Sequence, residues 1–194
     1  MSTVGILLAA GRGRRFDPVE NKLLQLLPDG QLVVGASAKN LLAVLPNVVA
    51  VVRPGDERVG AALKALGCAV TVCPDADSGM AASLVHAIDA TSDAASWLVA
   101  LGDMPHVQAG TIEALCAALA AGADIAVPTY QGRRGNPVGF GRIHLPLLLA
   151  LQGDQGARAI LKNHPVLEVE VSDIGILQDI DTRADLSSLQ TRGS

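Results

Sequence analysis

A glycine-rich loop with several cations follows the first apolar stretch of the chain. The run Val4–Ala9 predicts a buried strand, and Gly11 and Gly13 come directly after it. Four cations belong to this loop: Arg12, Arg14, Arg15 and Lys22. Glycines let backbone N–H groups approach phosphate oxygens, and cations neutralise phosphate charge. Positive charges this close together repel one another unless an anion lies between them. The loop therefore predicts a polyphosphate site, with a tight structural turn as the alternative.

The loop matches neither of the two common phosphate-binding motifs. A dinucleotide fingerprint, GxGxxG, would need glycine where Phe16 stands. A Walker A loop needs Gly-Lys followed by Ser or Thr, which this loop lacks. A nicotinamide oxidoreductase is therefore a disfavoured alternative.

A second candidate group is the carboxylate of Asp103. It follows the apolar run Trp97–Leu101 and lies in the turn Gly102–Pro105. A carboxylate at the end of a buried strand is costly unless it is paired or bound to a metal. Mg²⁺ prefers oxygen ligands, so Asp103 is a predicted metal ligand, and an aspartate that stabilises a turn is the alternative.

Asp179 and Asp181 lie at the end of a predicted last strand, Ile176–Ile180. We interpret the two aspartates as alternate residues that point to opposite faces of this strand. We therefore expect only one of the two aspartates to face the metal, and the other to be solvated or to cap a helix. Thr182 is a predicted cap for a following helix.

Strand-like and helix-like segments alternate along most of the chain. The other predicted strands are Val48–Val52, Ala69–Val72, Ile125–Pro128, Val138–Phe140 and Leu167–Val171, and the main predicted helices are Val33–Leu45, Glu57–Leu66, Met80–Ala90 and Ala109–Ala121. This order is typical of an α/β protein with a three-layer, Rossmann-like open sheet that is mostly parallel and carries helices on both faces. We expect a single domain over residues 1–190 and a frayed tail at 191–194.

The strand order along the chain also predicts where the site lies. In open α/β sheets, ligands bind outside the carboxyl ends of the strands. The loops 11–22, 75–79 and 102–105 each follow a predicted strand. We therefore expect all three to open onto one crevice.

The composition narrows the classes of protein. The 194 residues are 49% hydrophobic and 18% charged, which is a globular balance, and the net charge of −4 does not favour nucleic-acid binding. Mean hydropathy is +0.37, but the longest apolar runs are far short of the roughly 20 residues that span a bilayer. Three cysteines form no CxxC pair, and no basic segment precedes the first apolar run. We expect a cytoplasmic protein with reduced thiols and no membrane partner.

Five motifs, in the same order, resemble those of the molybdenum cofactor cytidylyltransferases and their MobA-like NTP transferase relatives. These are Leu8–Arg15 with Lys22, Gly102–Pro105, Gly135–Phe140, Gly153–Arg158 and Asp179–Leu186. The chain departs from the family pattern in the longer segment Phe16–Asn21 and in Asn136, where the family often has histidine. The resemblance implies a nucleotide-diphospho-sugar transferase type of fold.

The resemblance also implies an activity: CMP is transferred from CTP to the phosphate of a molybdopterin-type cofactor, and pyrophosphate is released. The implied cofactor is Mg²⁺, with Mn²⁺ as an alternative, and a molybdoenzyme is an implied partner. The implied catalytic residues are Arg12, Arg15, Lys22 and Asp103, and the implied metal ligands are Asp103 and Asp181. The implied nucleotide contacts are Leu8, Ala9, Ala10, Gly11, Gly13, Lys22, Asp75, Gly79 and Ser83. Asn136, Asp154 and Arg158 would face the acceptor.

Two further functions are alternatives. One is a guanylyltransferase or another NTP transferase with a different phosphorylated acceptor. The other is a non-catalytic accessory protein that carries the cofactor. Lys22 and Asp103 argue against the accessory protein, because a carrier has less need of metal-bridged phosphates.

Overall fold

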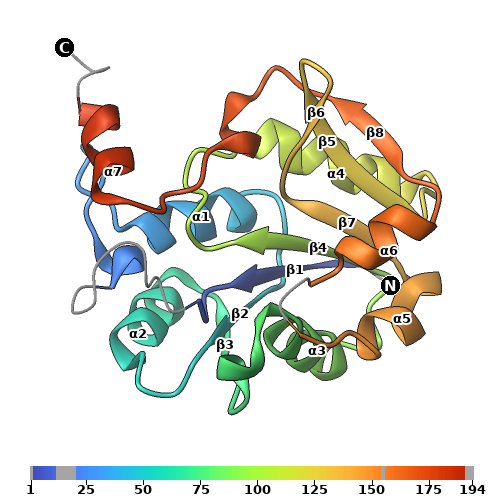
Figure 1. Ribbon diagram of the computed structural model, residues 1–194, viewed down its shortest axis with the longest axis horizontal. Helices are drawn as coiled ribbons and strands as arrows, with labels where there is room; N and C mark the ends of the chain where they lie inside the picture. The colour runs from blue at the N-terminus through green and yellow to red at the C-terminus, as the bar shows by residue number, and fades with distance from the viewer. Residues whose placement is uncertain (1, 12–20, 154–155, 191–194) are drawn as a thin grey trace.

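The computed structural model describes residues 2–11, 21–153 and 156–190 (Figure 1). The strands are β1 (Thr3–Leu8), β2 (Val48–Val52), β3 (Ala69–Val72), β4 (Ser96–Leu101), β5 (Ile125–Tyr130), β6 (Arg133–Arg134), β7 (Val138–Gly141) and β8 (Leu167–Glu170). The α-helices are α1 (Val33–Leu42), α2 (Glu57–Leu66), α3 (Met80–Ala90), α4 (Ala109–Ala120), α5 (Leu145–Leu149), α6 (Arg158–Asn163) and α7 (Arg183–Gln190). Short 3₁₀ helices are η1 (Lys22–Leu24), η2 (Ala76–Ser78), η3 (Arg142–His144) and η4 (Ile174–Leu177).

The strands form one mixed sheet in the order β3-β2-β1-β4-β7-β5, with β6 and β8 both paired to β5. The pairs β3–β2, β2–β1, β1–β4 and β5–β8 are parallel, whereas β7 runs antiparallel to both β4 and β5. This confirms the predicted open, mostly parallel sheet. Leu8 pairs with both Val51 and Leu101, so β1, β2 and β4 end at the same level. The loops that follow these strands are therefore neighbours.

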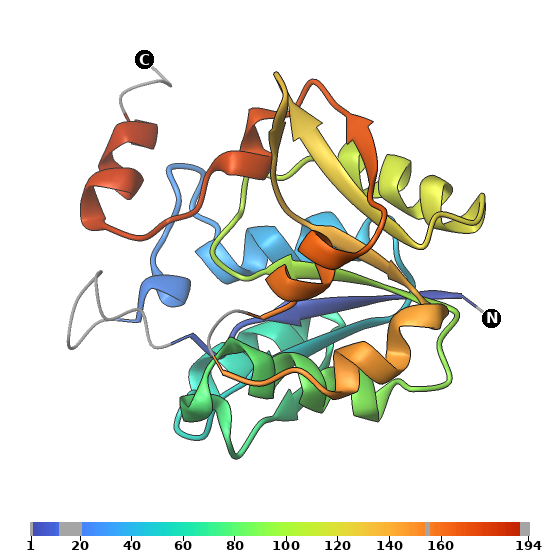
Figure 2. The same cartoon turned by 45° about the vertical axis from the view of Figure 1, so that its right-hand side comes forward.

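Helices cover both faces of the sheet, as predicted (Figure 2). On one face, α1, α2 and α4 pack around a core that includes Leu41, Leu63 and Leu115. On the other face, α3, α5 and α6 pack around Leu84, Leu148 and Ile160. A fully buried aliphatic side chain contributes roughly 1.5–3 kcal/mol, so the two cores together hold the loop-bearing sheet edge in place.

Helix α2 illustrates why the βα units are predictable from sequence. Val59 and Leu63, four residues apart, are fully buried on its inner face. Gly67 ends the helix with a φ of 104°, a conformation that glycine adopts without steric cost. The apolar spacing and the glycine stop are both local signals, and the predicted bounds match the structure.

The segment after β8 differs from the prediction. Residues 176–180, predicted as a strand, begin inside η4 and continue without regular structure. The Asp173 side chain accepts a hydrogen bond from Gly175 N (2.9 Å), and Gly175 packs so closely against the His106 carbonyl that a Cβ would overlap it. Ile180 is buried, and its N–H donates to the Asp103 carbonyl (2.9 Å). Long-range contacts therefore hold this segment against the turn after β4 rather than in the sheet.

Within the described part of the chain, no helix combines the length and the apolar character needed to cross a membrane.

Candidate active site

A cavity of about 490 Å³ opens at the carboxyl ends of β1, β3 and β4, which confirms that the three predicted loops share one crevice. Its volume lies in the range of small-molecule sites. The residues that line it are Leu8, Ala9, Ala10, Gly11, Lys22, Leu23, Ala76, Asp77, Gly79, Met80, Ser83, Leu101 and Asp103. Seven predicted nucleotide contacts are among them: Leu8, Ala9, Ala10, Gly11, Lys22, Gly79 and Ser83. Ala76, Asp77 and Met80 lie in the segment predicted to reach the crevice, but none of them was singled out as a nucleotide contact, because each is an ordinary loop or helix residue in the sequence.

The turn that carries Asp103 is held tightly against the end of β1. Gly102 N donates to the Leu8 carbonyl (2.9 Å), and a Cβ at residue 102 would lie only 3.2 Å from that oxygen. From α1, Ser37 Oγ donates to the Gly102 carbonyl (3.0 Å) and Asn40 Nδ2 donates to the Pro105 carbonyl (3.0 Å). Sequence reasoning missed both donors. The only sign of them in the sequence was that each is a polar residue on a helix face that is otherwise apolar.

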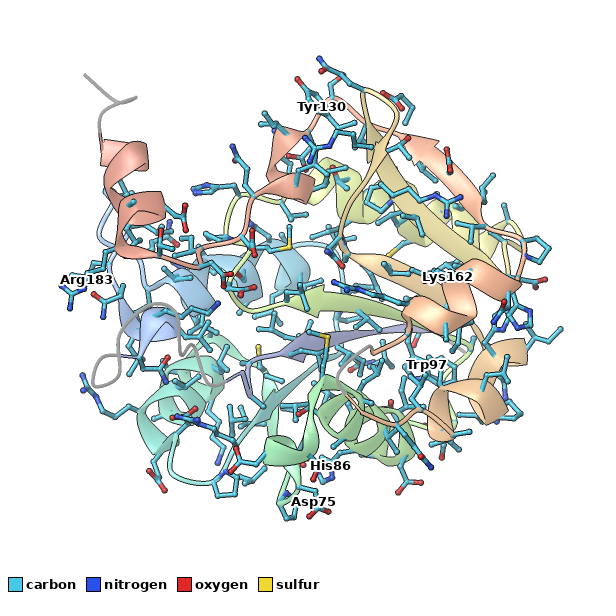
Figure 3. All side chains as sticks on the ribbon, in the orientation of Figure 1. Asp75, His86, Trp97, Tyr130, Lys162 and Arg183 are labelled. Carbon is cyan, nitrogen blue, oxygen red and sulfur yellow. The ribbon has the colours of Figure 1, made fainter. Side chains whose placement is uncertain are left out.

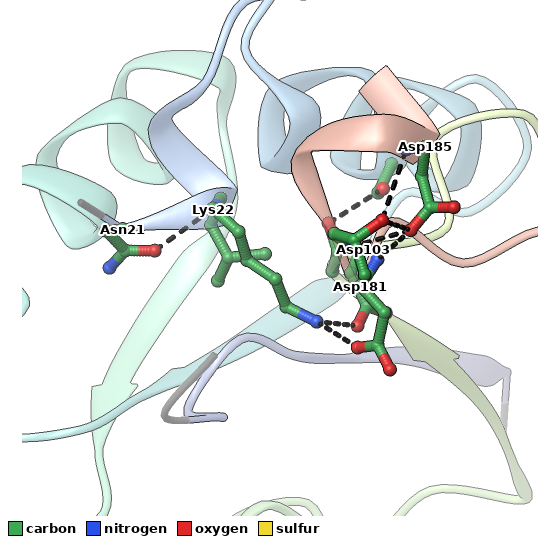
Figure 4. Close-up of polar contacts among 9 residues, drawn as sticks. Asn21, Lys22, Asp103, Asp181 and Asp185 are labelled. Carbon is green, nitrogen blue, oxygen red and sulfur yellow. Dashed lines mark hydrogen bonds and ion pairs between the residues drawn. The ribbon is translucent and has the colours of Figure 1, made fainter. Parts of the chain in front are cut away.

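Lys22 reaches the Asp103 carboxylate from the opposite side. Asn21 caps η1 by accepting a hydrogen bond from Leu23 N (3.0 Å), and Leu23 is buried. The Lys22 side chain, 9% exposed, places Nζ 2.6 Å from Asp103 Oδ2 and 3.1 Å from Asp181 Oδ1 (Figure 4). Burial alone would lower the pKa of Lys22, but Asp103 and Asp181 together outweigh burial and raise the pKa. Lys22 is therefore a protonated cation between two carboxylates.

Three carboxylates meet beside Lys22. Asp103, Asp179 and Asp181 each offer one oxygen, and these oxygens lie within 4.8 Å of one another. The expectation that only one of Asp179 and Asp181 faces the site is therefore wrong. Residues two apart in an extended segment share a face, and Ile180 between them is buried in the core instead.

A reciprocal cap orients Asp181. Asp185 Oδ2 accepts from Asp181 N (3.0 Å), from Thr182 N (2.6 Å) and from Thr182 Oγ1 (2.9 Å). In return, Thr182 Oγ1 accepts from Asp185 N (3.3 Å) at the start of α7, so Thr182 caps this helix as predicted. Burial alone would raise the pKa of Asp185, but the hydrogen bonds from Thr182 and Asp181 lower it.

The donor set fits a divalent cation. Carboxylate oxygens are the ligands that Mg²⁺ and Mn²⁺ prefer. Two of the three carboxylates already hold a positive charge, the Lys22 ammonium, at hydrogen-bonding distance. Asp103 and Asp181, with Asp179 added by the structure, are therefore the residues that would hold the metal.

The remaining predicted residues divide into two groups. Arg12, Gly13, Arg15 and Asp154 lie outside the described residues. Asp75, Asn136 and Arg158 are described, but none of them lines the cavity. Asp75 is exposed at the edge of the molecule (Figure 3), and Arg158 is exposed at the start of α6. Asn136 borders a separate, much smaller cavity beside Ser37 and Asn40.

The segment before α6 nevertheless touches the nucleotide side of the cavity. Gly153 O accepts a hydrogen bond from Ala81 N (3.2 Å) in the first turn of α3. Gly156 lies against the Met80 side chain, which would be 3.2 Å from a Cβ at that position. Gly153 and Gly156, which belong to one of the resembling motifs, are thus in contact with the start of α3 beside the cavity.

Comparison with known proteins places most of the chain in a family. Residues 5–169 match the family model described as the MobA-like NTP transferase domain. The matched region includes Lys22 and Asp103 and ends before Asp179 and Asp181.

Individual relatives extend over nearly the whole chain. The chain is 32% identical to the Purine catabolism protein PucB of Bacillus subtilis (strain 168), with 92% of this chain and 91% of PucB covered. The crystal structure of Rv0371c from Mycobacterium tuberculosis H37Rv is similar with a TM-score of 0.85 and 30% identity, covering 97% and 96% of the two chains. Rv0371c in complex with manganese gives a TM-score of 0.79 and 27% identity, covering 97% and 98%.

Proposed function

The chain belongs to the MobA-like NTP transferase family, and from this premise we propose that it is a metal-dependent cytidylyltransferase. It transfers CMP from CTP to the phosphate of a molybdopterin-type acceptor and releases pyrophosphate. One observation carries the proposal: Lys22, Asp103 and Asp181 form an ion-paired group at a nucleotide-sized cavity. Mg²⁺ is the proposed cofactor, with Mn²⁺ as an alternative.

The proposed reaction needs no strong base. A phosphate monoester is largely ionised at neutral pH, so an acceptor oxygen can attack the α-phosphorus of the NTP directly. A new P–O bond forms on the acceptor, and the bond from the α-phosphorus to the bridging oxygen breaks. Pyrophosphate leaves with that electron pair. Positioning and charge neutralisation are then the main tasks of the protein.

The described residues divide these tasks between them. Leu8–Gly11 and Gly79–Ser83 form the walls that hold the nucleoside, where Ala9, Ala10, Gly11 and Gly79 leave the main chain accessible to it. Lys22 balances charge on the triphosphate. Asp103 and Asp181, with Asp179, hold the divalent cation, which when bound neutralises phosphate oxygens. Asn21, Ser37 and Asn40 keep Lys22 and Asp103 in place through the hydrogen bonds described above.

The acceptor assignment has separate support. The motifs Gly135–Phe140 and Gly153–Arg158 resemble those of molybdenum cofactor cytidylyltransferases. The contact of Gly153 with Ala81 supports an acceptor that approaches from this side, next to the nucleotide. We place the reaction in the cytoplasm, with a molybdoenzyme as the recipient of the product. Cys68, Cys73 and Cys116 are free thiols, which agrees with a reducing compartment.

A pyrophosphate-release screen tests the proposal. The purified protein is incubated with CTP, GTP, ATP or UTP and with Mg²⁺ or Mn²⁺, each with and without molybdopterin cofactor. We expect release with CTP that requires both the acceptor and the metal.

Each other outcome changes the proposal in a defined way. Release with GTP alone would make the protein a guanylyltransferase. If molybdopterin gave no release but another phosphorylated acceptor, added in its place, did, that compound would replace molybdopterin as the proposed acceptor. No release with any pair, together with measurable cofactor binding, would favour the accessory protein.

A further inference from the structure

The ammonium of Lys22 is bound to two of the three carboxylates that would hold a divalent cation. Its Nζ lies 2.6 Å from Asp103 Oδ2 and 3.1 Å from Asp181 Oδ1, and the dashed lines in Figure 4 mark both ion pairs. Both oxygens belong to carboxylates of the three-aspartate cluster. Among the described residues, the Lys22 ammonium is therefore a cation already bound at this cluster, and it belongs to the protein.

Electrostatics explains why Lys22 occupies this position. Three carboxylates within 4.8 Å of one another repel strongly when nothing compensates their charge. Lys22 is 9% exposed and Asp103 is 20% exposed, so solvent screens their interaction only in part. The ammonium therefore stabilises the folded cluster before any ligand arrives.

The same ammonium cannot remain there in the loaded site. A divalent cation on Asp103 and Asp181 would lie within a few ångströms of Nζ, and like charges at that separation repel. In the function proposed above, on which this step rests, the displaced ammonium has a new anionic partner, the triphosphate. Lys22 is carried on the short η1 element and reaches the site through a flexible four-carbon stem, so only its side chain has to move.

We propose that Lys22 is an internal counter-cation of Asp103 and Asp181, which the divalent cation displaces onto the nucleotide. The metal and the nucleotide then bind cooperatively. A nucleotide that draws Lys22 away frees carboxylate oxygens for the metal, and a metal that repels Lys22 makes it available to the triphosphate. Linkage requires each ligand to raise the affinity of the other by the same factor.

Metal titration of a neutral variant tests this. Mn²⁺ binding is measured by calorimetry without nucleotide, in the wild type and in Lys22→Met, which keeps most of the length of the side chain but removes its charge. We expect Lys22→Met to bind Mn²⁺ about tenfold more tightly than the wild type, because the competing cation is gone. Lys39→Met is the matched control. Lys39 is exposed on α1 and donates to Gln31, so its loss changes the net charge equally but leaves Mn²⁺ binding unchanged.

A measurement on the wild-type protein guards against misfolding of the variant. Lysine acetylation is followed by peptide mass spectrometry, with exposed Lys39, Lys64 and Lys162 as references. We expect slow labelling of Lys22 without ligand, severalfold faster labelling with Mg²⁺ alone, and renewed protection when a CTP analogue with an α,β-methylene bridge is added.

The outcomes separate this inference from the proposed function. Equal or weaker Mn²⁺ binding by folded Lys22→Met, or Lys22 labelling that Mg²⁺ leaves unchanged, would overturn the inference even if pyrophosphate release were normal. Conversely, the Mn²⁺ titration uses no acceptor and no turnover. A failed pyrophosphate screen would therefore leave the competition between Lys22 and the metal standing.

Discussion

Asp103 and Asp173 are both largely buried, yet the chain holds them in opposite ways. Asp173 is 2% exposed, and its oxygens accept from Gln108 N (2.8 Å), Thr111 Oγ1 (2.7 Å) and Gly175 N (2.9 Å). These donors are all neutral and belong to the start of α4 and to η4. Asp103 is 20% exposed, faces the cavity and is held by the Lys22 ammonium.

The difference separates a structural carboxylate from a functional one. Two of the three donors to Asp173 are main-chain N–H groups, which cannot move away without disrupting the fold, so its oxygens stay bound to the protein. A lysine side chain can move, so the oxygens of Asp103 can change partners while the backbone stays in place. The type of donor, rather than burial alone, indicates which aspartate acts in the site.

Asp103→Asn gives the largest expected effect on activity. We expect pyrophosphate release to fall by about 10³-fold, because the site loses the charge that binds the cation and pairs with Lys22. The free energy of unfolding should change by no more than about 1 kcal/mol, since the Ile180 hydrogen bond to the residue 103 carbonyl remains. Kinetics and thermal unfolding measure the two effects. An activity loss below tenfold would contradict the assignment of Asp103.

Asp173→Ala should show the reverse pattern. Three donors lose their acceptor in a buried place, which costs about 3 kcal/mol and lowers the unfolding midpoint by roughly 6–12 °C. The activity of the folded fraction should stay within about threefold of the wild type. Asp89→Ala, an exposed aspartate near the end of α3, is the control and should leave the midpoint almost unchanged. If Asp173→Ala lost activity without losing stability, the distinction between the two aspartates would fail.

His144 extends the comparison to a buried histidine, and its expected effect is the smallest. Among the described residues, its Nε2 has no hydrogen-bond partner, and its ring packs edge-on to His164. Burial, and then the charge of His164, lower the pKa of His144, although Asp124 opposes them. Because the unfolded chain binds this proton more readily, stability should fall as the pH drops below about 6.5.

The unfolding midpoint between pH 7.5 and 5.5 measures this loss, with His144→Phe as the comparison. The variant should show a shallower slope than the wild type. A slope should remain, because burial also lowers the pKa of His106. An unchanged slope in His144→Phe would show that His144 does not contribute.

The βα units were predictable because their signals are local. The bounds of β2, α2, β3 and α3 match the prediction, since each is an apolar run of the right length that glycine, proline or polar residues interrupt. The shared crevice followed from one topological rule, that parallel strands present their carboxyl ends to the same edge. Lys22 and Asp103, each beside such an end, were therefore found by position as well as by resemblance.

The segment from Asp173 to Asp181 was predicted poorly because distant residues shape it. Asp173 is bonded to Gln108 and Thr111, Gly175 packs on His106, and Ile180 bonds to Asp103. The local pattern of apolar residues does not indicate any of these contacts. That pattern was the only basis for predicting a strand. The pairing of Asp179 with Asp181 on one face, however, was available from their spacing.

The hydrogen bond from Ile180 to Asp103 joins two segments of the chain that the ribosome makes at different times. The ribosome delivers the walls of the cavity first, since Leu8, Ser83 and Asp103 all lie in the first 103 residues. Asp179 and Asp181 emerge more than 70 residues later. A nascent chain can therefore fold its sheet edge and its cavity while the carboxylate cluster is still incomplete. The site gains its full negative charge only after Asp179 and Asp181 have been made.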